Sequence, residues 1–67
     1  MATPPLLKRL NEETVLESIR TGAPISRAEI ARRAGISKPT VSLALRTLLD
    51  AGLVREAAAG QIGRAHV

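Results

Sequence analysis

The sequence predicts a small, mostly α-helical domain in which three helices precede a two-stranded β-hairpin. Three observations predict this class: helix start signals at Ser26 and Ser37, apolar residues that recur at helical spacing after each signal, and two short β-prone runs near the C-terminus. A chain of 67 residues forms one domain at most, and such a domain buries only about 60% of the surface that its unfolded chain exposes. Its stability is therefore expected to be modest.

The first helix is predicted from Asn11 to about Arg20. Two apolar sets fall on opposite sides of a helical wheel: Leu6, Leu7 and Leu10 on one side, and Val15, Leu16 and Ile19 on the other. Because one straight helix cannot bury both sets in one core, Asn11 is interpreted as an N-cap. Residues 1–10 are then an N-terminal arm, either a helix whose leucines need another surface or a frayed tail, and residues 11–67 are the folded domain.

The second helix is predicted to begin at Ser26, after the connector GAPIS. The sequence S-R-A-E is a capping box, in which the Ser26 hydroxyl and the Glu29 carboxylate each accept a hydrogen bond from a backbone N–H without a helical partner. Two arginines follow Glu29 at spacings that favour ion pairs, and Gly35 ends the helix. The predicted buried face consists of Ala28, Ile30, Ala31 and Ala34.

The third helix is predicted from Ser37 to about Asp50. Ser37 is its N-cap, and Pro39 lies in the first turn, where backbone N–H groups have no partner within the helix. The predicted buried stripe consists of Val41, Ala44, Leu45, Leu48 and Leu49. The opposite face is predicted to carry Pro39, Thr40, Leu43, Arg46 and Thr47, with Ser42 beside them.

The second and third helices have the spacing of a helix-turn-helix. The turn Gly35–Ile36–Ser37 joins them, Ala31 four residues before the glycine lets the helices touch, and Val41 six residues after it fills the angle between them. A helix, this pair and a terminal hairpin together predict a winged helix-turn-helix.

The hairpin is predicted from the last fifteen residues. LVREA is expected to form a strand, AAAGQIG a turn region, and RAHV the beginning of a return strand. Because the chain stops early in that strand, we expect it to be the front piece of a longer protein. His66 has no second ligand near it in the sequence and is interpreted as a strand residue, so no metal site and no cofactor are predicted.

Composition and charge narrow the class of partner. The chain has no Cys, Phe, Trp or Tyr, which excludes disulfides, zinc fingers and aromatic platforms for stacked bases. The net charge is +4, and the segment from Ser18 to Leu49 holds six basic residues against Glu29 alone, which favours a polyanionic partner. Without a secretory signal or a membrane-spanning run, a cytoplasmic protein is expected.

These features predict contacts with double-stranded DNA. The N-terminal turn of a recognition helix points into the major groove, where side chains reach base edges and phosphates. The predicted contacts from the third helix are Ser37, Lys38, Pro39, Thr40, Ser42, Leu43, Arg46 and Thr47. Ser26 and Arg27 are predicted to contact the DNA backbone, and Arg64, after the glycines of the turn, to enter the minor groove. Leu43 is open to two interpretations, a base contact or a surface residue without a role.

The segment LNEETVLESIRTGAPISRAEIARRAGISKPTVSLALRTLLDAGLVRE, followed by GRA, resembles the N-terminal winged helix-turn-helix of the ROK family of bacterial transcriptional regulators. The resemblance implies that the recognition-helix residues face DNA and that Arg64 enters the minor groove. Two positions depart from the family pattern: Ala65 replaces the proline of a G-R-P wing, and Leu43 replaces a residue that is usually polar or basic.

The resemblance further implies a sugar-responsive regulator, a repressor, with a palindromic operator and a nucleoid-associated location. A homo-oligomer is expected for the longer regulator, whose sugar effector binds a domain absent from this chain. The isolated chain is expected to be a monomer, or at most weakly dimeric through its N-terminal leucines. The alternative is a winged helix used for protein interaction without sequence-specific DNA binding, and an enzyme is not expected.

Overall fold

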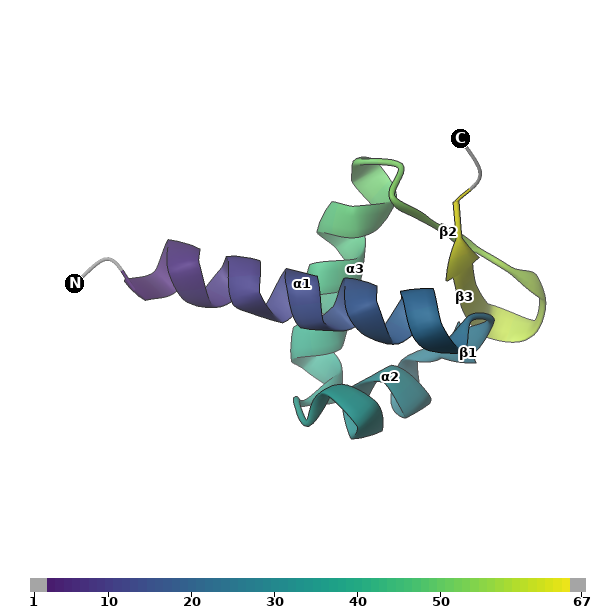
Figure 1. Cartoon of the computed structure of the whole chain (residues 1–67), viewed down its shortest axis with the longest axis horizontal. Coiled ribbons are helices and arrows are strands. Elements are labelled where there is room, and N and C mark those ends of the chain that lie inside the picture. The colour runs from purple at the N-terminus through teal and green to yellow at the C-terminus, as the bar shows by residue number, and fades with distance from the viewer. Residues whose placement is uncertain (1–2, 66–67) are drawn as a thin grey trace.

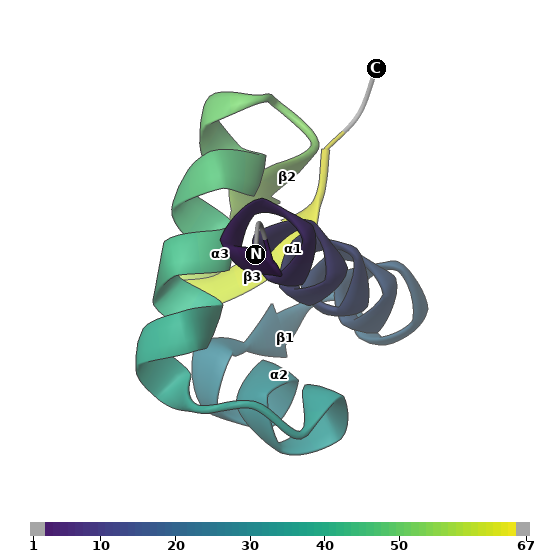
Figure 2. The same ribbon diagram turned by 90° about the vertical axis from the view of Figure 1, so that its left-hand side faces the viewer.

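The computed structural model describes residues 3–65, with side chains from residue 6 onward. The elements are α1 (Thr3–Gly22), β1 (Ile25–Ser26), α2 (Arg27–Ala34), α3 (Lys38–Asp50), β2 (Val54–Glu56), the short 3-10 turn η1 (Ala58–Gly60) and β3 (Gln61–Arg64). In Figure 1, α1 crosses α3, α2 lies beside the N-terminal end of α3, and the strands gather near the C-terminal end of α1. Figure 2 shows α2 and α3 around α1, seen along that helix. This arrangement confirms the predicted winged helix-turn-helix. The predicted strand residue His66 lies outside the described residues.

Helix α1 is continuous from Thr3 to Gly22, so the predicted helix start at Asn11 is wrong. Pro4 and Pro5 fall in the first turn, where a missing N–H costs no hydrogen bond. The helix does not have to bury both apolar sets, because the set nearer the N-terminus stays exposed to solvent. Residues 3–10 are therefore the first turns of α1 and not a separate segment.

The two helix caps in the middle of the chain form as predicted. The Ser26 hydroxyl accepts a hydrogen bond from the Glu29 N–H at 3.1 Å, and the Ser37 hydroxyl accepts one from the Thr40 N–H at 3.3 Å. Gly35 ends α2 with φ 72°, and its N–H donates to the Ala31 carbonyl at 2.9 Å. The second half of the predicted capping box does not form, because the Glu29 carboxylate pairs with Arg32 and Arg33.

The sheet has three antiparallel strands in the order β1-β3-β2, not the two that were predicted. The connector supplies the additional strand, since Ile25 pairs with Ile62 and Ser26 with Gln61. Strand β3 begins at Gln61, three residues before the predicted return strand, and Arg64 is its last residue. The wing is thus joined by backbone hydrogen bonds to the residues that lead into α2.

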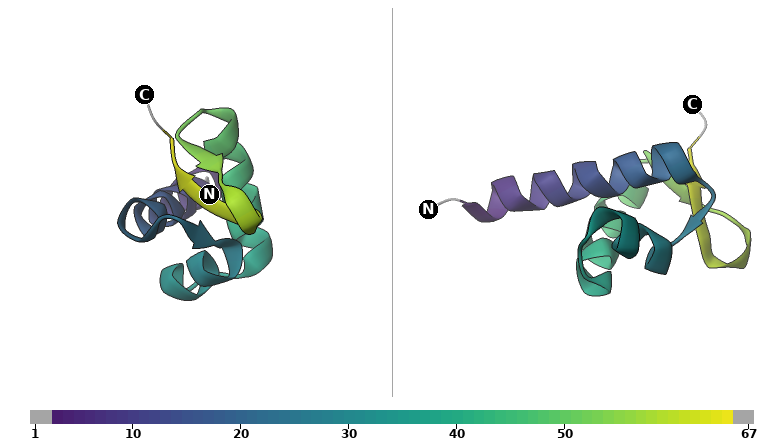
Figure 3. Two further views of the ribbon diagram at one scale, coloured as in Figure 1. Left: turned by 90° about the vertical axis from the view of Figure 1, so that its right-hand side faces the viewer. Right: turned by 60° about the horizontal axis from the view of Figure 1, so that its bottom comes forward.

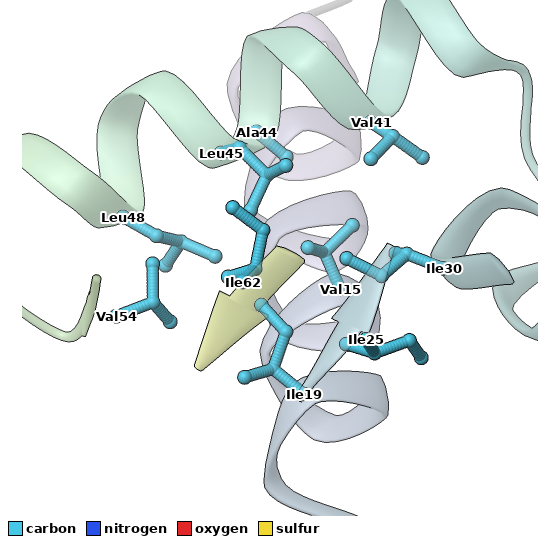
Figure 4. Close-up of a cluster of buried hydrophobic side chains, with 10 residues drawn as sticks. All are labelled: Val15, Ile19, Ile25, Ile30, Val41, Ala44, Leu45, Leu48, Val54 and Ile62. Atoms are coloured by element: carbon cyan, nitrogen blue, oxygen red, sulfur yellow. The ribbon is translucent and has the colours of Figure 1, made fainter. Parts of the chain in front are cut away.

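One apolar core connects all of these elements (Figure 4). Its buried members are Val15, Ile19, Ile25, Ile30, Val41, Ala44, Leu45, Leu48, Val54 and Ile62. Every strand contributes one residue to this core, so the sheet packs against the helices. Ala28, predicted to be buried on α2, is exposed, and Leu49 on α3 is only half-buried. Among residues 3–65, no helix combines the length and the hydrophobicity that crossing a bilayer requires.

Candidate nucleic-acid interface

The surface of α3 is divided into two grooves by Arg46, which borders both. The first groove, called here the Arg27 flank, runs between α3 and the start of α2 and is lined by Arg27, Ser42, Leu45, Arg46, Leu49 and Asp50. The second, the Leu7 flank, runs between α3 and the first turns of α1 and is lined by Leu7, Lys8, Asn11, Glu12, Thr40, Leu43, Ala44, Arg46 and Thr47. The predicted recognition face is therefore shared between two chemically different grooves.

The N-terminal turn of α3 is held by its cap. The hydroxyl oxygens of Ser37 and Thr40 lie 2.9 Å apart in a hydrogen bond, in addition to the bond from the Thr40 N–H. Lys38 and Pro39 are exposed at the same end of the helix, and Thr40 is half-buried. These hydrogen bonds hold the backbone of the first turn in place, so the side chain of Lys38 extends from an ordered helix end.

Most of the central positive charge is already paired within the domain. Arg32 and Arg33 pair with Glu29, Arg20 lies 3.6 Å from a carboxylate oxygen of Glu17, and Arg27 lies 3.3 Å from one of Glu56. Within residues 6–65, neither Lys38 nor Arg46 has an ion-pair partner, and both are exposed. Among the six basic residues from Ser18 to Leu49, the two on α3 are thus the ones whose charge remains available to a polyanion.

Arg27 connects the helix-turn-helix to the wing, a role that the sequence did not indicate. Its guanidinium donates to a carboxylate oxygen of Glu56 on β2 and, at 3.5 Å, to the Gly60 carbonyl in the wing turn. Ser26, the other predicted backbone contact, is half-buried and uses its hydroxyl oxygen as the α2 cap. The pairing partner of Arg27 is 29 residues away in sequence, so no local pattern could have found it.

Arg64 does not lie at the wing turn, where its position after the glycines had placed it. The turn is formed by residues 57–60, whereas Arg64 pairs with Val54 at the opposite end of the hairpin. Its side chain is exposed, and its carbonyl accepts a hydrogen bond from Arg55 Nε at 3.2 Å. The longer β3 explains the difference, because Gln61, Ile62 and Gly63 are strand residues and not part of the turn.

Leu43 is 65% exposed and belongs to the Leu7 flank. Its neighbour in sequence, Ser42, belongs to the Arg27 flank, because adjacent residues of a helix point about 100° apart. The first turns of α1 project past α3 on the side away from the wing (Figures 1 and 3). Leu43 therefore shares its groove with a helix of its own chain.

Comparison with known proteins finds a helix-turn-helix family and two repressors. A family model described as a helix-turn-helix domain matches residues 6–57. Xylose repressors of Bacillus spizizenii (strain ATCC 23059 / NRRL B-14472 / W23) and Bacillus subtilis (strain 168) are 38% and 36% identical over 55 residues, which are 82% of this chain and 14% of each repressor. The chain thus spans a small N-terminal share of these relatives in length, and the predicted resemblance to ROK-type repressors is confirmed over that region.

A solved structure shares the fold. The crystal structure of the O-methyltransferase NcsB1 from neocarzinostatin biosynthesis, in complex with S-adenosyl-L-homocysteine, aligns with a TM-score of 0.69 and 23% identity over 98% of this chain and 22% of that one. At this identity the likeness concerns the fold alone.

Proposed function

Because this chain belongs to the helix-turn-helix domain family, we propose that it binds double-stranded DNA sequence-specifically, as the operator-reading domain of a transcriptional repressor. A DNA-binding regulatory role follows from the family and from the xylose-repressor relatives. The observation that carries the proposal is the exposed, unpaired charge of Lys38 and Arg46 on α3, in a described chain whose other central basic residues are paired.

The proposed contacts centre on Arg46 and the Arg27 flank. Arg46 lies between the two grooves, where its guanidinium can bond a guanine edge or a phosphate. The hydroxyl of Ser42 on the Arg27 flank can bond either as well. Lys38 at the N-terminal turn supplies a phosphate contact, and Pro39 an apolar surface for a thymine methyl. Arg27 reaches a phosphate when it leaves Glu56.

Four further predicted contacts lie away from the Arg27 flank. Thr40 and Thr47 line the Leu7 flank, and a minor-groove contact by Arg64 requires DNA to reach the end of the hairpin opposite the turn. The location of Leu43 beside Leu7 favours contact with protein over contact with a base.

For the whole regulator we propose a homo-oligomer on a palindromic operator, with a sugar effector bound outside this chain. The name of the two xylose repressors motivates the sugar effector, and the paired half-sites that are usual for helix-turn-helix dimers motivate the homo-oligomer and the palindrome. With DNA as its partner, the proposed location is the cytoplasm, in association with the nucleoid, and we assign this chain no catalytic role.

The test is a selection of bound duplexes followed by affinity measurement with Arg46→Ala. Losing the Arg46 contact is expected to weaken specific binding by about 10- to 100-fold, or about 1–3 kcal/mol. Arg20→Ala is the matched control, because it removes one positive charge from α1, where the guanidinium lies 3.6 Å from Glu17. Fluorescence anisotropy over a salt series should show log affinity falling with log salt.

Equal, weak binding to every duplex, unchanged by Arg46→Ala, would contradict sequence-specific recognition. Equal losses for Arg46→Ala and Arg20→Ala would mean that only net charge matters.

A further inference from the structure

Each flank of α3 contains a basic residue from a different neighbouring helix. On the Arg27 flank this residue is Arg27, at the start of α2. On the Leu7 flank it is Lys8, near the start of α1. Arg46 borders both flanks and so lies between the other two. Lys8 is absent from the contacts predicted from the sequence, because its place beside α3 depends on how α1 crosses that helix.

The major groove of DNA is about as wide as an α-helix with its side chains. The groove is about 12 Å wide, and the diameter of a helix with its side chains is about 10–12 Å. A recognition helix therefore fills the groove, and the two sugar–phosphate strands that form its walls lie along the two sides of the helix. With α3 in the groove, one strand lies along the Arg27 flank and the other along the Leu7 flank.

The ammonium group of Lys8 is accessible to such a strand. The Lys8 side chain is 65% exposed and that of Glu12 only 17%, so the lysine carries the more accessible of these two charges. Lys8 Nζ lies 3.9 Å from Glu12 Oε2, whereas Arg27 lies 3.3 Å from its partner Glu56. Ion pairs between exposed side chains are weak, so a phosphate can take the place of the Glu12 carboxylate as the partner of Lys8.

The position of Lys8 depends on the unbroken α1. Because this helix begins at Thr3, its first turns project past α3 on the side away from the wing (Figures 1 and 3). The same helix is held in the core by Val15 and Ile19, which are fully buried. Lys8 therefore extends from an anchored helix, and it loses less conformational entropy on binding than a lysine on a flexible arm would lose.

We propose that Lys8 contacts a phosphate of the DNA strand opposite to the one that Arg27 contacts, so that α1 and α2 hold the two walls of the major groove on either side of α3. This inference rests on the proposed DNA binding and adds a contact to it. Phosphate contacts fix the orientation of a protein on the duplex and carry no direct sequence information. Lys8 therefore contributes affinity and leaves the preferred sequence unchanged.

The first test is the affinity of Lys8→Gln for the duplex that the unchanged 67-residue chain selects. At about 0.1 M salt, the loss of one phosphate contact should weaken binding about 3- to 10-fold, and the slope of log affinity against log salt should fall by about 0.9. Selection with Lys8→Gln should return the same preferred sequence. Lys8→Arg keeps the charge and should bind within about 2-fold of the unchanged chain.

The matched control is Arg9→Gln, which removes one positive charge from the next residue of α1. Arg9 is exposed and does not line the Leu7 flank, because adjacent residues of a helix point about 100° apart. This variant should bind within about 2-fold of the unchanged chain. Glutamine is a good helix former, and circular dichroism checks that each variant stays folded.

Neutral methylphosphonates identify the strand. Each phosphate of the selected duplex is replaced in turn, and affinity is measured for the unchanged chain, Lys8→Gln and Arg27→Gln. A replacement that weakens binding of the unchanged chain but not of Lys8→Gln marks the phosphate that Lys8 contacts. The phosphate marked in the same way by Arg27→Gln should lie on the other strand, across the major groove.

Three results would overturn the proposal while leaving specific DNA binding intact. The first is a Lys8→Gln variant with the affinity and the salt slope of the unchanged chain. The second is an equal loss with Lys8→Gln and Arg9→Gln, which would mean that only net charge matters. The third is a pair of marked phosphates on one strand. A chain that selects no duplex at all would instead contradict the proposed function, and this inference with it.

Discussion

The two flanks of α3 use neighbouring residues for opposite purposes. On the Arg27 flank, Ser42 and Asp50 face a guanidinium that is tied to the wing. On the Leu7 flank, Leu43 shares a groove with Leu7 of α1, and a buried carboxylate oxygen of Glu12 lies in the same groove. The difference teaches that the outward side of α3 is not one uniform face. The element packed next to each residue decides what that residue can contact.

The largest expected effect comes from a substitution in the core beneath α3, which holds both flanks in place. Leu45 is 1% exposed and joins α3 to the core, so Leu45→Ala should cost roughly 2–5 kcal/mol of unfolding free energy. A single core of this size supplies only about 3–5 kcal/mol, so the substitution should remove most of the stability of the domain. Urea denaturation followed by circular dichroism measures this.

Leu53→Ala is the control for the core substitution. Leu53 is exposed, and the change should stay within about 0.5 kcal/mol. If Leu45→Ala unfolded at the same urea concentration as the unchanged chain, the core described here would be wrong.

A pair of adjacent substitutions separates the two flanks directly. Ser42→Ala should weaken specific DNA binding by about 3- to 10-fold, since it loses one hydrogen bond of about 0.5–1.5 kcal/mol. Leu43→Ala should leave DNA affinity within about 2-fold, because Leu43 lies on the Leu7 flank. Fluorescence anisotropy with the two variants measures both affinities. A loss of DNA affinity with Leu43→Ala and not with Ser42→Ala would assign base contact to the Leu7 flank.

The smallest expected effect concerns the pair between Arg27 and Glu56. Glu56→Gln removes the charge that holds Arg27 and is expected to raise DNA affinity by up to about 5-fold, with a steeper dependence on salt. The cost in stability should stay below about 1 kcal/mol, because both side chains are partly exposed. Titrations at two salt concentrations test this. Unchanged affinity and unchanged slope would show that Arg27 serves the wing alone.

Local signals in the sequence were sufficient for the helix-turn-helix. Ser26, Gly35 and Ser37 act through hydrogen bonds and backbone angles of their own neighbourhood, and all three end or begin a helix as predicted. Its periodicity also predicted the buried stripe of α3, apart from Leu49, which is half-buried. These features depend on contacts within a few residues, which a sequence displays directly.

Features that depend on distant contacts were missed. The predicted start of α1 at Asn11 depends on the assumption that both apolar sets need burial, but one set remains exposed. Strand β1 has two residues, too few to show an alternating pattern, and exists because Ile62 pairs with it. The division of α3 into two flanks depends on where α1 projects, which no pattern within α3 contains.

The strand β1 also affects the stiffness of the domain. It runs directly into the cap of α2, while its partner β3 carries the wing. Any displacement of the wing relative to α2 therefore has to break backbone hydrogen bonds of a sheet, and a swinging hinge between the two is absent from the described fold. When the domain meets a duplex whose grooves are spaced differently, the deformation falls on the nucleic acid, so the flexibility of base steps that the protein never touches becomes part of what it selects.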